Sequence, residues 1–344
     1  MSYTAQFAYR QNTPYTGNLS GVTELYAKLN DRDVAPIMTF NCEEAFSENG
    51  VNSYELSPNG DSRRWLGSIP LDDVEVLINR MGRSIKEDRL PDGTVLPPMI
   101  NANATRSLAF RKHRAANEVL LPLGLTMPTQ LVNSPADVER FLAENPAPEI
   151  ILKPDNGTNS QGVERLDRSA VAQYYLDNPA KYGRNIAQPA YDFTGPLPPH
   201  MRAYDAASQE AFDGWNRSGK PKELRIYGFH SPQETTVFPI ARAIDKGDNW
   251  FFVDPQSVPA ELMTGTAAAI ALAAEVSGAA AMLGTVDYGY GSTGSESPSF
   301  QAIELNGKAP YLLGYDKHQA IADTLRDQFA DSIAQTAEHK VRIA

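Results

Sequence analysis

Two strand-like segments in the last quarter of the chain place acidic and amide side chains at fixed positions. The first covers residues 284–287, and after a loop the chain returns as Phe-Gln-Ala-Ile-Glu-Leu-Asn-Gly over residues 300–307. Residues two apart on a strand point to the same face, so Glu304 and Asn306 project together. When the two segments pair as a hairpin, Asp287 can lie opposite them. The pattern predicts a β-sheet with a polar site on one face.

Two carboxylates and one amide oxygen on a shared face form a set of hard-oxygen donors. Mg²⁺ prefers such ligands and completes its octahedron with waters and nucleotide phosphates. A polar face in contact with solvent is the alternative interpretation. Apolar residues at the alternate positions indicate a sheet with a defined inner side, which favours the metal site. The candidate metal ligands are Asp287, Glu304 and Asn306.

A second polar segment follows the apolar run Glu149–Pro154, whose fifth residue is Lys153. The loop over residues 155–162 can bring backbone N–H groups close to phosphate oxygens, and its hydroxyls add further donors. Most loops of this composition are plain turns, but a lysine at the adjacent strand end favours phosphate binding. The Walker motif is excluded, because the two residues after the second glycine are Val and Glu. The candidate phosphate contacts in the loop are Gly157, Thr158, Ser160 and Gly162.

The order of the other segments predicts a mixed α/β and α+β chain. Val34–Phe40 and residues 74–79 are short apolar runs that suit buried parallel strands. Further on, residues 223–229 and 236–243 suit paired antiparallel strands, and the sheet they begin would be covered by helices. The expected helices cover residues 108–121, a segment capped by Ser134, residues 259–276 capped near Ser257, and residues 317–337.

These elements are expected to form three lobes. Residues 1–106 would form an open N-terminal α/β domain, residues 107–190 a central lobe and residues 191–344 a C-terminal lobe. Within the last lobe, residues 192–222 are rich in Pro, Gly and polar residues. They should offer little apolar surface, so we expect a lid or insertion there that becomes ordered with nucleotide.

Taken in order, the segments over residues 101–315 resemble the ATP-grasp superfamily, which includes D-alanine–D-alanine ligase, glutathione synthetase and the glutamate-adding ligases. The resemblance implies the ATP-grasp fold preceded by an open α/β domain. The matching pieces are Arg111-Lys112 with Gly124 and Pro128, Leu152-Lys153-Pro154 with its loop, the hinge Ala187-Gln188-Pro189-Ala190-Tyr191, Glu223-Leu224-Arg225 with Arg242, and Asp287 with Glu304-Leu305-Asn306.

The resemblance also implies roles for these residues. Lys112 and Lys153 would neutralise ATP phosphates, while the glycine loop closes over them. The hinge, with Gln188, would bind the adenine edge through backbone groups of Pro189 and Tyr191. Asp287, Glu304 and Asn306 would hold one or two Mg²⁺ ions. Arg225 or Arg242 would stabilise charge on the transferred phosphoryl group.

The chain departs from the family pattern at three places. Pro189 replaces the usual hinge acid, Arg111 stands where many members have Asp, and the ribose-binding acid has only Asp192 as a candidate. These departures leave the subfamily open.

The implied activity is an ATP- and Mg²⁺-dependent ligase that joins a carboxylate to an amine through an acyl phosphate. By family analogy the substrates are amino acids or short peptides. A small-molecule kinase on the same fold and a non-catalytic nucleotide-binding module are the alternatives, and a glycosidase built on paired acids would not explain Lys153. No residue stands out as a general base, and His230 and His318 are interpreted as structural.

Composition excludes several other classes of protein. With 42 acidic and 31 basic residues the net charge is −11, which disfavours nucleic-acid binding. Cys42 is the only cysteine, so an intrachain disulfide and a Cys-rich zinc site are impossible. The sequence has no run of about 18 apolar residues, so no membrane span is predicted. We expect a cytoplasmic protein with small-molecule or peptide substrates, and we leave open self-association into a homodimer.

Overall fold

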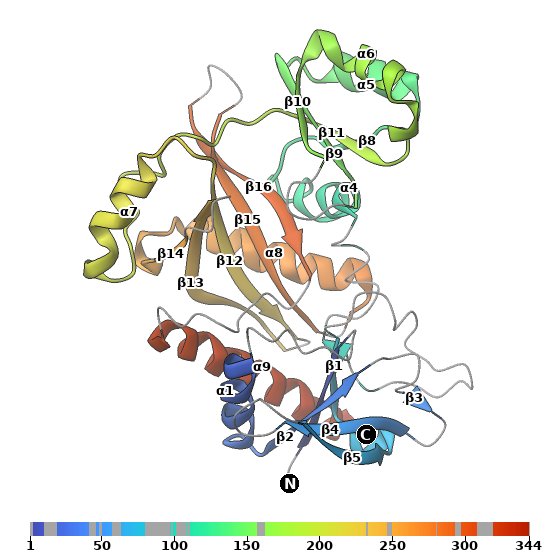
Figure 1. The fold of residues 1–344 in the computed structure, drawn as a ribbon, viewed down its shortest axis with the longest axis vertical. Coiled ribbons are helices and arrows are strands. Elements are labelled where there is room, and N and C mark those ends of the chain that lie inside the picture. Colours follow the sequence, from blue (N-terminus) through green and yellow to red (C-terminus); the bar gives the residue numbers. More distant parts are fainter. Residues whose placement is uncertain are drawn as a thin grey trace.

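The computed structural model describes residues 3–9, 19–40, 46–47, 50–56, 63–79, 97, 99–100, 108, 111–156, 162–231, 233–245, 250–279, 281–292, 297–307 and 319–343. In this part of the chain, three β-sheets follow one another along the long axis of the molecule (Figure 1). The mixed α/β and α+β organisation predicted from the sequence is confirmed. None of the described helices is long and apolar enough to cross a membrane.

The N-terminal sheet has a parallel centre and an antiparallel margin. Its parallel strands are β1 (Tyr3–Tyr9), β2 (Val34–Phe40), β6 (Val76–Asn79) and β7 (Met99–Ile100). The margin is formed by β3 (Phe46–Ser47), β4 (Gly50–Leu56) and β5 (Arg63–Ile69). The apolar runs predicted as parallel strands are β2 and β6. The polar margin strands were not predicted, because their sequences lack the apolar run of a strand that is buried on both faces.

The last helix of the chain packs against this N-terminal region. Helix α9 (Gln319–Ile343) lies beside α1 (Leu19–Asn30), which connects β1 to β2 (Figure 1). Phe329 of α9 belongs to the same buried apolar cluster as Leu25 and Leu29 of α1. Ion pairs join the exposed side of the two helices, including Lys28 Nζ–Asp327 Oδ2 at 2.7 Å. The helix was predicted for residues 317–337, and its observed C-terminal end is six residues later.

The central lobe is a four-stranded antiparallel sheet in the order β10-β9-β11-β8. The strands are β8 (Gln130–Leu131), β9 (Glu149–Pro154), β10 (Glu164–Asp167) and β11 (Asn185–Pro189). Helices α5 (Pro135–Glu144) and α6 (Val171–Asp177) cover it with a shared apolar core (Figure 1). The Ser134 side chain accepts a hydrogen bond from the Asp137 N–H, so the predicted cap of α5 is confirmed.

The C-terminal sheet is antiparallel throughout, in the order β14-β13-β12-β15-β16. Its strands are β12 (Lys222–His230), β13 (Thr235–Asp245), β14 (Trp250–Val253), β15 (Met282–Gly291) and β16 (Ser299–Asn306). Helix α8 (Ala260–Ser277) packs on one face, which leaves the other face for the site described below. The predicted cap of α8 at Ser257 is wrong: the helix begins after Pro259, and the Ser257 hydroxyl donates to the Asp254 carbonyl in the preceding turn at 2.7 Å.

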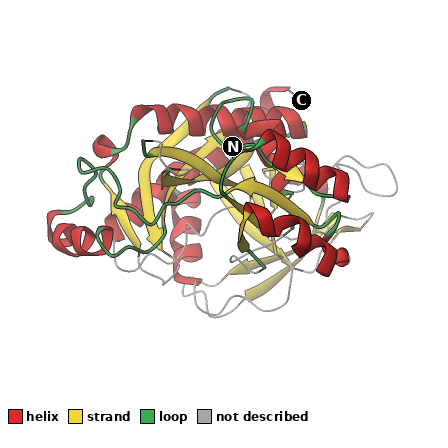
Figure 2. Cartoon of the chain, turned by 90° about the horizontal axis from the view of Figure 1, so that it is seen from above, coloured by secondary structure: helices red, strands yellow, loops and turns green. Residues whose placement is uncertain are grey.

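Residues 192–222 are held to the C-terminal sheet by apolar contacts, contrary to the expectation from composition. They include helix α7 (Gln209–Asn216), which lies at the left of the molecule in both views (Figure 1, Figure 2). Phe212 and Trp215 of α7 are buried with Leu197 and Met201 in the core of the C-terminal sheet. Four large side chains are enough to hold down a segment whose average composition is polar. The apolar surface of this segment was therefore underestimated.

The contact between α9 and α1 should contribute strongly to stability. Phe329 is 1% exposed, and Phe329→Ala should lower the free energy of unfolding by about 3–5 kcal/mol through lost burial and the cavity it leaves. Denaturant unfolding measures this change. Asp331→Ala on the same helix is the control: it removes an exposed ion pair with Arg32 and should cost less than about 1 kcal/mol. Equal effects of the two variants would show that α9 is not packed as described.

Candidate functional site

Strand register brings three charged residues into one row across the C-terminal sheet. Arg225 on β12 lies opposite Asp287 on β15, and Asp287 lies opposite Glu304 on β16. Residues directly opposite each other in an antiparallel pair share a face. The neighbouring residues Leu224 and Ile226 pack with α8 in the core, so the charged row is on the face away from α8. The predicted hairpin that joins Asp287 to Glu304 is confirmed.

The carboxylate of Asp287 is bound by protein groups on both oxygens. Arg225 donates to it from Nε at 2.7 Å and from Nη2 at 2.6 Å, and Asn306 Nδ2 donates at 3.0 Å. Asp287 is 1% exposed, so the charge on this acid is compensated without water. The attraction of Asp287 raises the pKa of the Arg225 guanidinium above its already high value, against the opposing effect of burial. Two parallel N–H···O bonds also fix the direction of both side chains.

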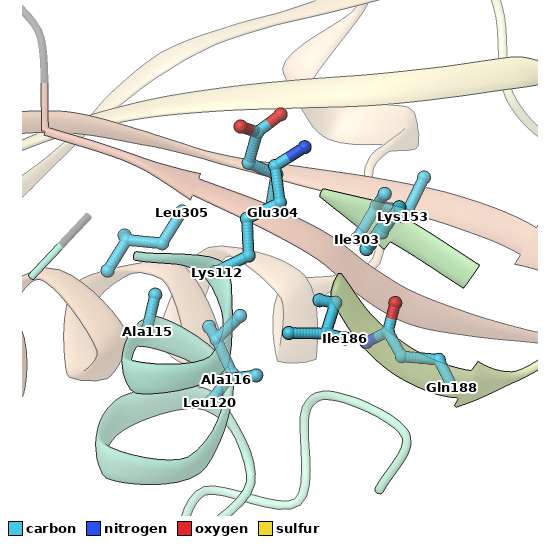
Figure 3. Close-up of a pocket in the computed structure, with 10 residues that line it drawn as sticks. All are labelled: Lys112, Ala115, Ala116, Leu120, Lys153, Ile186, Gln188, Ile303, Glu304 and Leu305. Carbon is cyan, nitrogen blue, oxygen red and sulfur yellow. The ribbon is translucent and has the colours of Figure 1, made fainter. Parts of the chain in front are cut away.

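Glu304 shares a buried space with two lysines from the central lobe. Figure 3 shows the ammonium of Lys112 close to the Glu304 carboxylate, with Lys153 on the same side of the cleft. Burial raises the pKa of Glu304, and Asp287 raises it further, while Lys112, Lys153 and Arg225 oppose the shift. Burial also lowers the pKa of Lys153 to about 8, assisted by Lys112 and opposed by Glu304. These groups form an electrostatically coupled cluster.

A pocket between the central and C-terminal sheets is lined by Lys112, Lys153 and Glu304 of this cluster. Its walls are mostly apolar and come from both sides (Figure 3). As it stands, the pocket has room for about one water molecule, so the two sides must separate to admit a larger ligand. The lining residues are Lys112, Ala115, Ala116, Leu120, Lys153, Ile186, Gln188, Ile303, Glu304 and Leu305.

Asp155 fixes the helix that carries Lys112. This helix begins as α4 (Lys112–Arg114), continues as a π-helical segment over Ala115–Leu120, and has no cap from its own side chains. Asp155 supplies the cap: its carboxylate accepts from the His113 N–H at 2.9 Å, and its carbonyl accepts from the Lys112 N–H at 3.2 Å. Asp155 is 1% exposed and follows β9, so the two lysines are held at adjacent positions. Sequence reasoning missed this role, because the helix lies about 40 residues upstream.

The linker between the central lobe and the C-terminal sheet, residues 190–193, is fixed to the β15–β16 hairpin. Tyr191 Oη donates to the Gly291 carbonyl at 2.6 Å and lies 3.0 Å from Ser299 Oγ. Asp192 and Ser292 exchange backbone hydrogen bonds of 2.9 and 3.2 Å. A Cβ atom on Gly291 would lie 1.7 Å from the Asp192 carbonyl oxygen, so only glycine permits this approach.

The other predicted nucleotide contacts are hinge residues on β11 and residues of the glycine loop. Pro189 ends β11 and pairs with Ile150, and the Gln188 side chain donates to the hydroxyl of Thr129 while also lining the pocket. Gly162 has a φ of +72°, which favours glycine. Gly157, Thr158 and Ser160 lie outside the described residues.

Arg242 and the three predicted metal ligands complete the comparison of sequence with structure. Arg242 lies opposite Arg225 in the β12–β13 register, but its side chain is not among the described ones. Within the described part of the chain, no three His, Cys, Asp or Glu side chains gather as a metal cluster. The predicted metal set has only two acids and owes its third donor to the amide of Asn306. Asp287 and Asn306 are in direct contact, and Glu304 is the neighbour of Asp287 across the strand pair.

Comparison with known proteins identifies the fold. No protein-family model matches the sequence, and no curated protein matches it. Solved structures do match over nearly the whole chain. VanG D-Ala:D-Ser ligase from Enterococcus faecalis is 13% identical, with 98% of this chain and 100% of VanG covered and a TM-score of 0.58. D-cycloserine synthetase DcsG is 16% identical, with 96% and 99% covered and a TM-score of 0.54.

A third match names the fold. The ATP-grasp ligase PsnB, solved with a phosphomimetic variant of a minimal precursor, Mg and ADP, is 14% identical, with 98% of this chain and 99% of PsnB covered and a TM-score of 0.53. The chain has the ATP-grasp fold. The expectation drawn from five short segments is thus confirmed for the fold. In this chain a further sheet, formed by β1–β7, precedes in sequence the two sheets that form the pocket.

The Arg225–Asp287 pair should be strongly coupled in a double-mutant cycle. Either single substitution to Ala leaves a buried charge without its partner and should lower the free energy of unfolding by about 3–5 kcal/mol. The double variant should lose clearly less than the sum of the two single losses. The exposed pair Arg165–Glu149 is the control, and its coupling should be within error of zero. Additive losses at Arg225 and Asp287 would contradict the bidentate geometry.

Proposed function

We propose that the protein is an ATP- and Mg²⁺-dependent ligase that joins a carboxylate to an amine through an acyl phosphate. One observation carries the proposal: Lys112 and Lys153 of the central lobe line one pocket with Glu304, which belongs to the Arg225–Asp287–Glu304 row of the C-terminal sheet. Positive groups beside hard-oxygen donors are what a metal-bound polyphosphate requires.

The nucleotide would lie in the pocket between the two sheets. Its phosphates would be neutralised by Lys112 and Lys153, whose positions are fixed by Asp155 and β9. The apolar lining suits the faces of the adenine, and backbone groups of Pro189 and Tyr191 would bind the adenine edge. The structural neighbour PsnB was solved with Mg and ADP, which supports a nucleotide and magnesium as the ligands. Cleft opening at the α4 side would precede binding, because the pocket is narrow.

The residues present fit a magnesium ion. The buried carboxylate of Glu304 has a raised pKa, and a divalent cation would stabilise its charged form. Asn306 directs its Nδ2 to Asp287, which leaves its Oδ1 as an oxygen donor. Asp287, Glu304 and Asn306 would therefore hold the ion, which when bound neutralises charge on the β- and γ-phosphates. The two hydrogen bonds from Arg225 fix the direction of the Asp287 carboxylate.

The proposed reaction has two steps. A carboxylate oxygen of the substrate attacks the γ-phosphorus, forming an acyl phosphate and releasing ADP. The amine nitrogen then attacks the acyl carbon, an amide forms, phosphate leaves, and the amine gives up a proton. Arg225 and Arg242 would stabilise the negative charge of the phosphoryl group and of the tetrahedral adduct. Closure of the pocket keeps water away from the acyl phosphate.

Amino acids or short peptides are the proposed substrates. The structural neighbours are named for D-Ala:D-Ser ligation and D-cycloserine synthesis, and one is solved with a minimal precursor. A small-molecule kinase would phosphorylate a hydroxyl group stably, and a nucleotide-binding module would not turn ATP over. A cytoplasmic location and a lack of nucleic-acid and membrane partners remain predictions, as do the lobe boundaries at residues 106 and 190. Self-association into a homodimer remains open.

ATP-to-ADP turnover against a panel of amino acids and dipeptides tests the proposal. ADP release should require both a carboxylate and an amine, and hydroxylamine should trap the acyl phosphate as a hydroxamate. Glu304→Gln should abolish turnover with little loss of stability, because it removes a metal-binding charge from a site where burial already disfavours that charge. Glu144→Gln, on the exposed side of α5, is the control. Full turnover by Glu304→Gln, or phosphorylated product without amide, would overturn the ligase assignment.

The variant Lys153→Ala tests whether Lys153 binds the nucleotide or is an ordinary lysine at a strand end. Loss of a buried cation beside the phosphates should raise the KM for ATP by about tenfold or more and lower turnover. Steady-state kinetics with ATP as the varied substrate measures this. Lys181→Ala, elsewhere in the central lobe, should leave both constants unchanged. Unchanged constants in Lys153→Ala would remove Lys153 from the site.

A further inference from the structure

Thr285 carries a buried hydroxyl that no part of the proposed function uses. The residue is 0% exposed, and its Oγ1 has no hydrogen-bond partner among the described residues. Folded proteins pair nearly all buried polar atoms, because an unpaired one loses its bond to water without replacement. Because Thr285 lies two residues from Asp287 of the charged row, its unpaired hydroxyl is a candidate contact for a bound ligand.

Thr285 belongs to the face of the sheet that carries the charged row. It lies two residues before Asp287 on β15, and two residues along a strand share a face. Across the strand pairs it is opposite Asn306 on β16 and Tyr227 on β12. Asn306 in turn donates to Asp287, so the row with Thr285 is in direct contact with the row of Arg225, Asp287 and Glu304.

The order of residues along β15 gives Thr285 a position relative to the nucleotide. The linker that would bind the adenine edge is fixed at Gly291, at the end of β15. Asp287 and Glu304, near the lysines, come next along the strand and would lie at the terminal phosphates. Thr285 lies two residues beyond Asp287 along β15, which puts it roughly 6.6 Å farther from the linker than Asp287. It therefore lies beyond the terminal phosphate, on the side from which the second reactant must attack.

No described group of the charged row is bonded to the Thr285 hydroxyl. The Asp287 carboxylate, two residues away, accepts from Arg225 and Asn306 instead. Other residues of the site are buried as well in this closed state: Asp287 is 1% exposed and Lys153 is 8% exposed. The same opening that admits a nucleotide would expose all three residues.

We propose that Thr285 binds an oxyanion of the reacting carboxylate. Its O–H donates to a carboxylate oxygen of the substrate and, after phosphoryl transfer, to a phosphate oxygen of the acyl phosphate. The assignment rests on the proposed function, and it makes Thr285 a contact for the acid substrate rather than for ATP.

Inorganic phosphate is the probe, because it is the oxyanion released at this position. Calorimetric titration with phosphate is carried out on the full chain, both alone and loaded with ADP and Mg²⁺. Thr285→Val keeps the shape and removes the donor, so its Kd for phosphate should rise about tenfold. Thr285→Ser should bind phosphate as the wild type does. The affinity for ADP should be the same in all three proteins.

Thr266 is a matched control on helix α8, which packs on the other face of the sheet. It is also 0% exposed, but its Oγ1 is paired with Tyr288 Oη at 3.0 Å. Thr266→Val should lose stability and keep its phosphate affinity. Thr285→Val should be as stable as the wild type or more so, because it removes an unpaired hydroxyl from the core.

Three results would overturn the proposal. They are unchanged phosphate affinity in Thr285→Val, no phosphate binding by the wild type in either titration, and a loss of stability in Thr285→Val as large as in Thr266→Val. Failure of the proposed function gives a different result. A wild type that never releases ADP, with phosphate affinity still dependent on the Thr285 hydroxyl, retains the oxyanion contact and loses only the ligase assignment.

Discussion

Burial of charge is the constraint that organises this protein. Asp287 is almost inaccessible to water and depends on the two-pronged contact with Arg225, which in turn requires β12 and β15 to pair in one register. A shift of one residue would turn one of these side chains to the face covered by α8. The register that satisfies Asp287 also places Glu304 beside it. Formation of the C-terminal sheet and assembly of the charged row are therefore the same event.

The central lobe contributes a complementary set of positive charges. Lys153 lies at a strand end and Lys112 at a helix start, and Asp155 binds the backbone of that helix start to the end of β9. The charge of Lys112 disfavours the charged form of Lys153, while Glu304 and Glu223 favour it. A polyanion such as a nucleotide would relieve the repulsion. The energetic cost of holding two cations together without ligand then becomes part of the affinity for the ligand.

Sequence reasoning identified the residues whose signal is local. Alternation along residues 300–307 placed Glu304 and Asn306 on one face, and the apolar run before Lys153 marked a strand end. It did not find the Arg225–Asp287 pair, whose members are 62 residues apart, or the cap from Asp155, because register and helix packing decide those contacts. Thr285 carried no signal at all, since an unpaired hydroxyl is recognised only from its surroundings. In residues 192–222, average polarity concealed Phe212 and Trp215.

The glycine at position 291 has a consequence for how the molecule can move. Because the Asp192 carbonyl lies where a Cβ atom would be, backbone touches backbone at the junction of the two lobes. No side chain separates the two backbone segments here, so their spacing is set by the backbone hydrogen bonds between Asp192 and Ser292. A methyl group at this position would push the linker away from β15. This would displace Lys112 and Lys153 although no residue that lines the pocket is substituted. The geometry of the pocket therefore depends on the absence of a Cβ atom at Gly291.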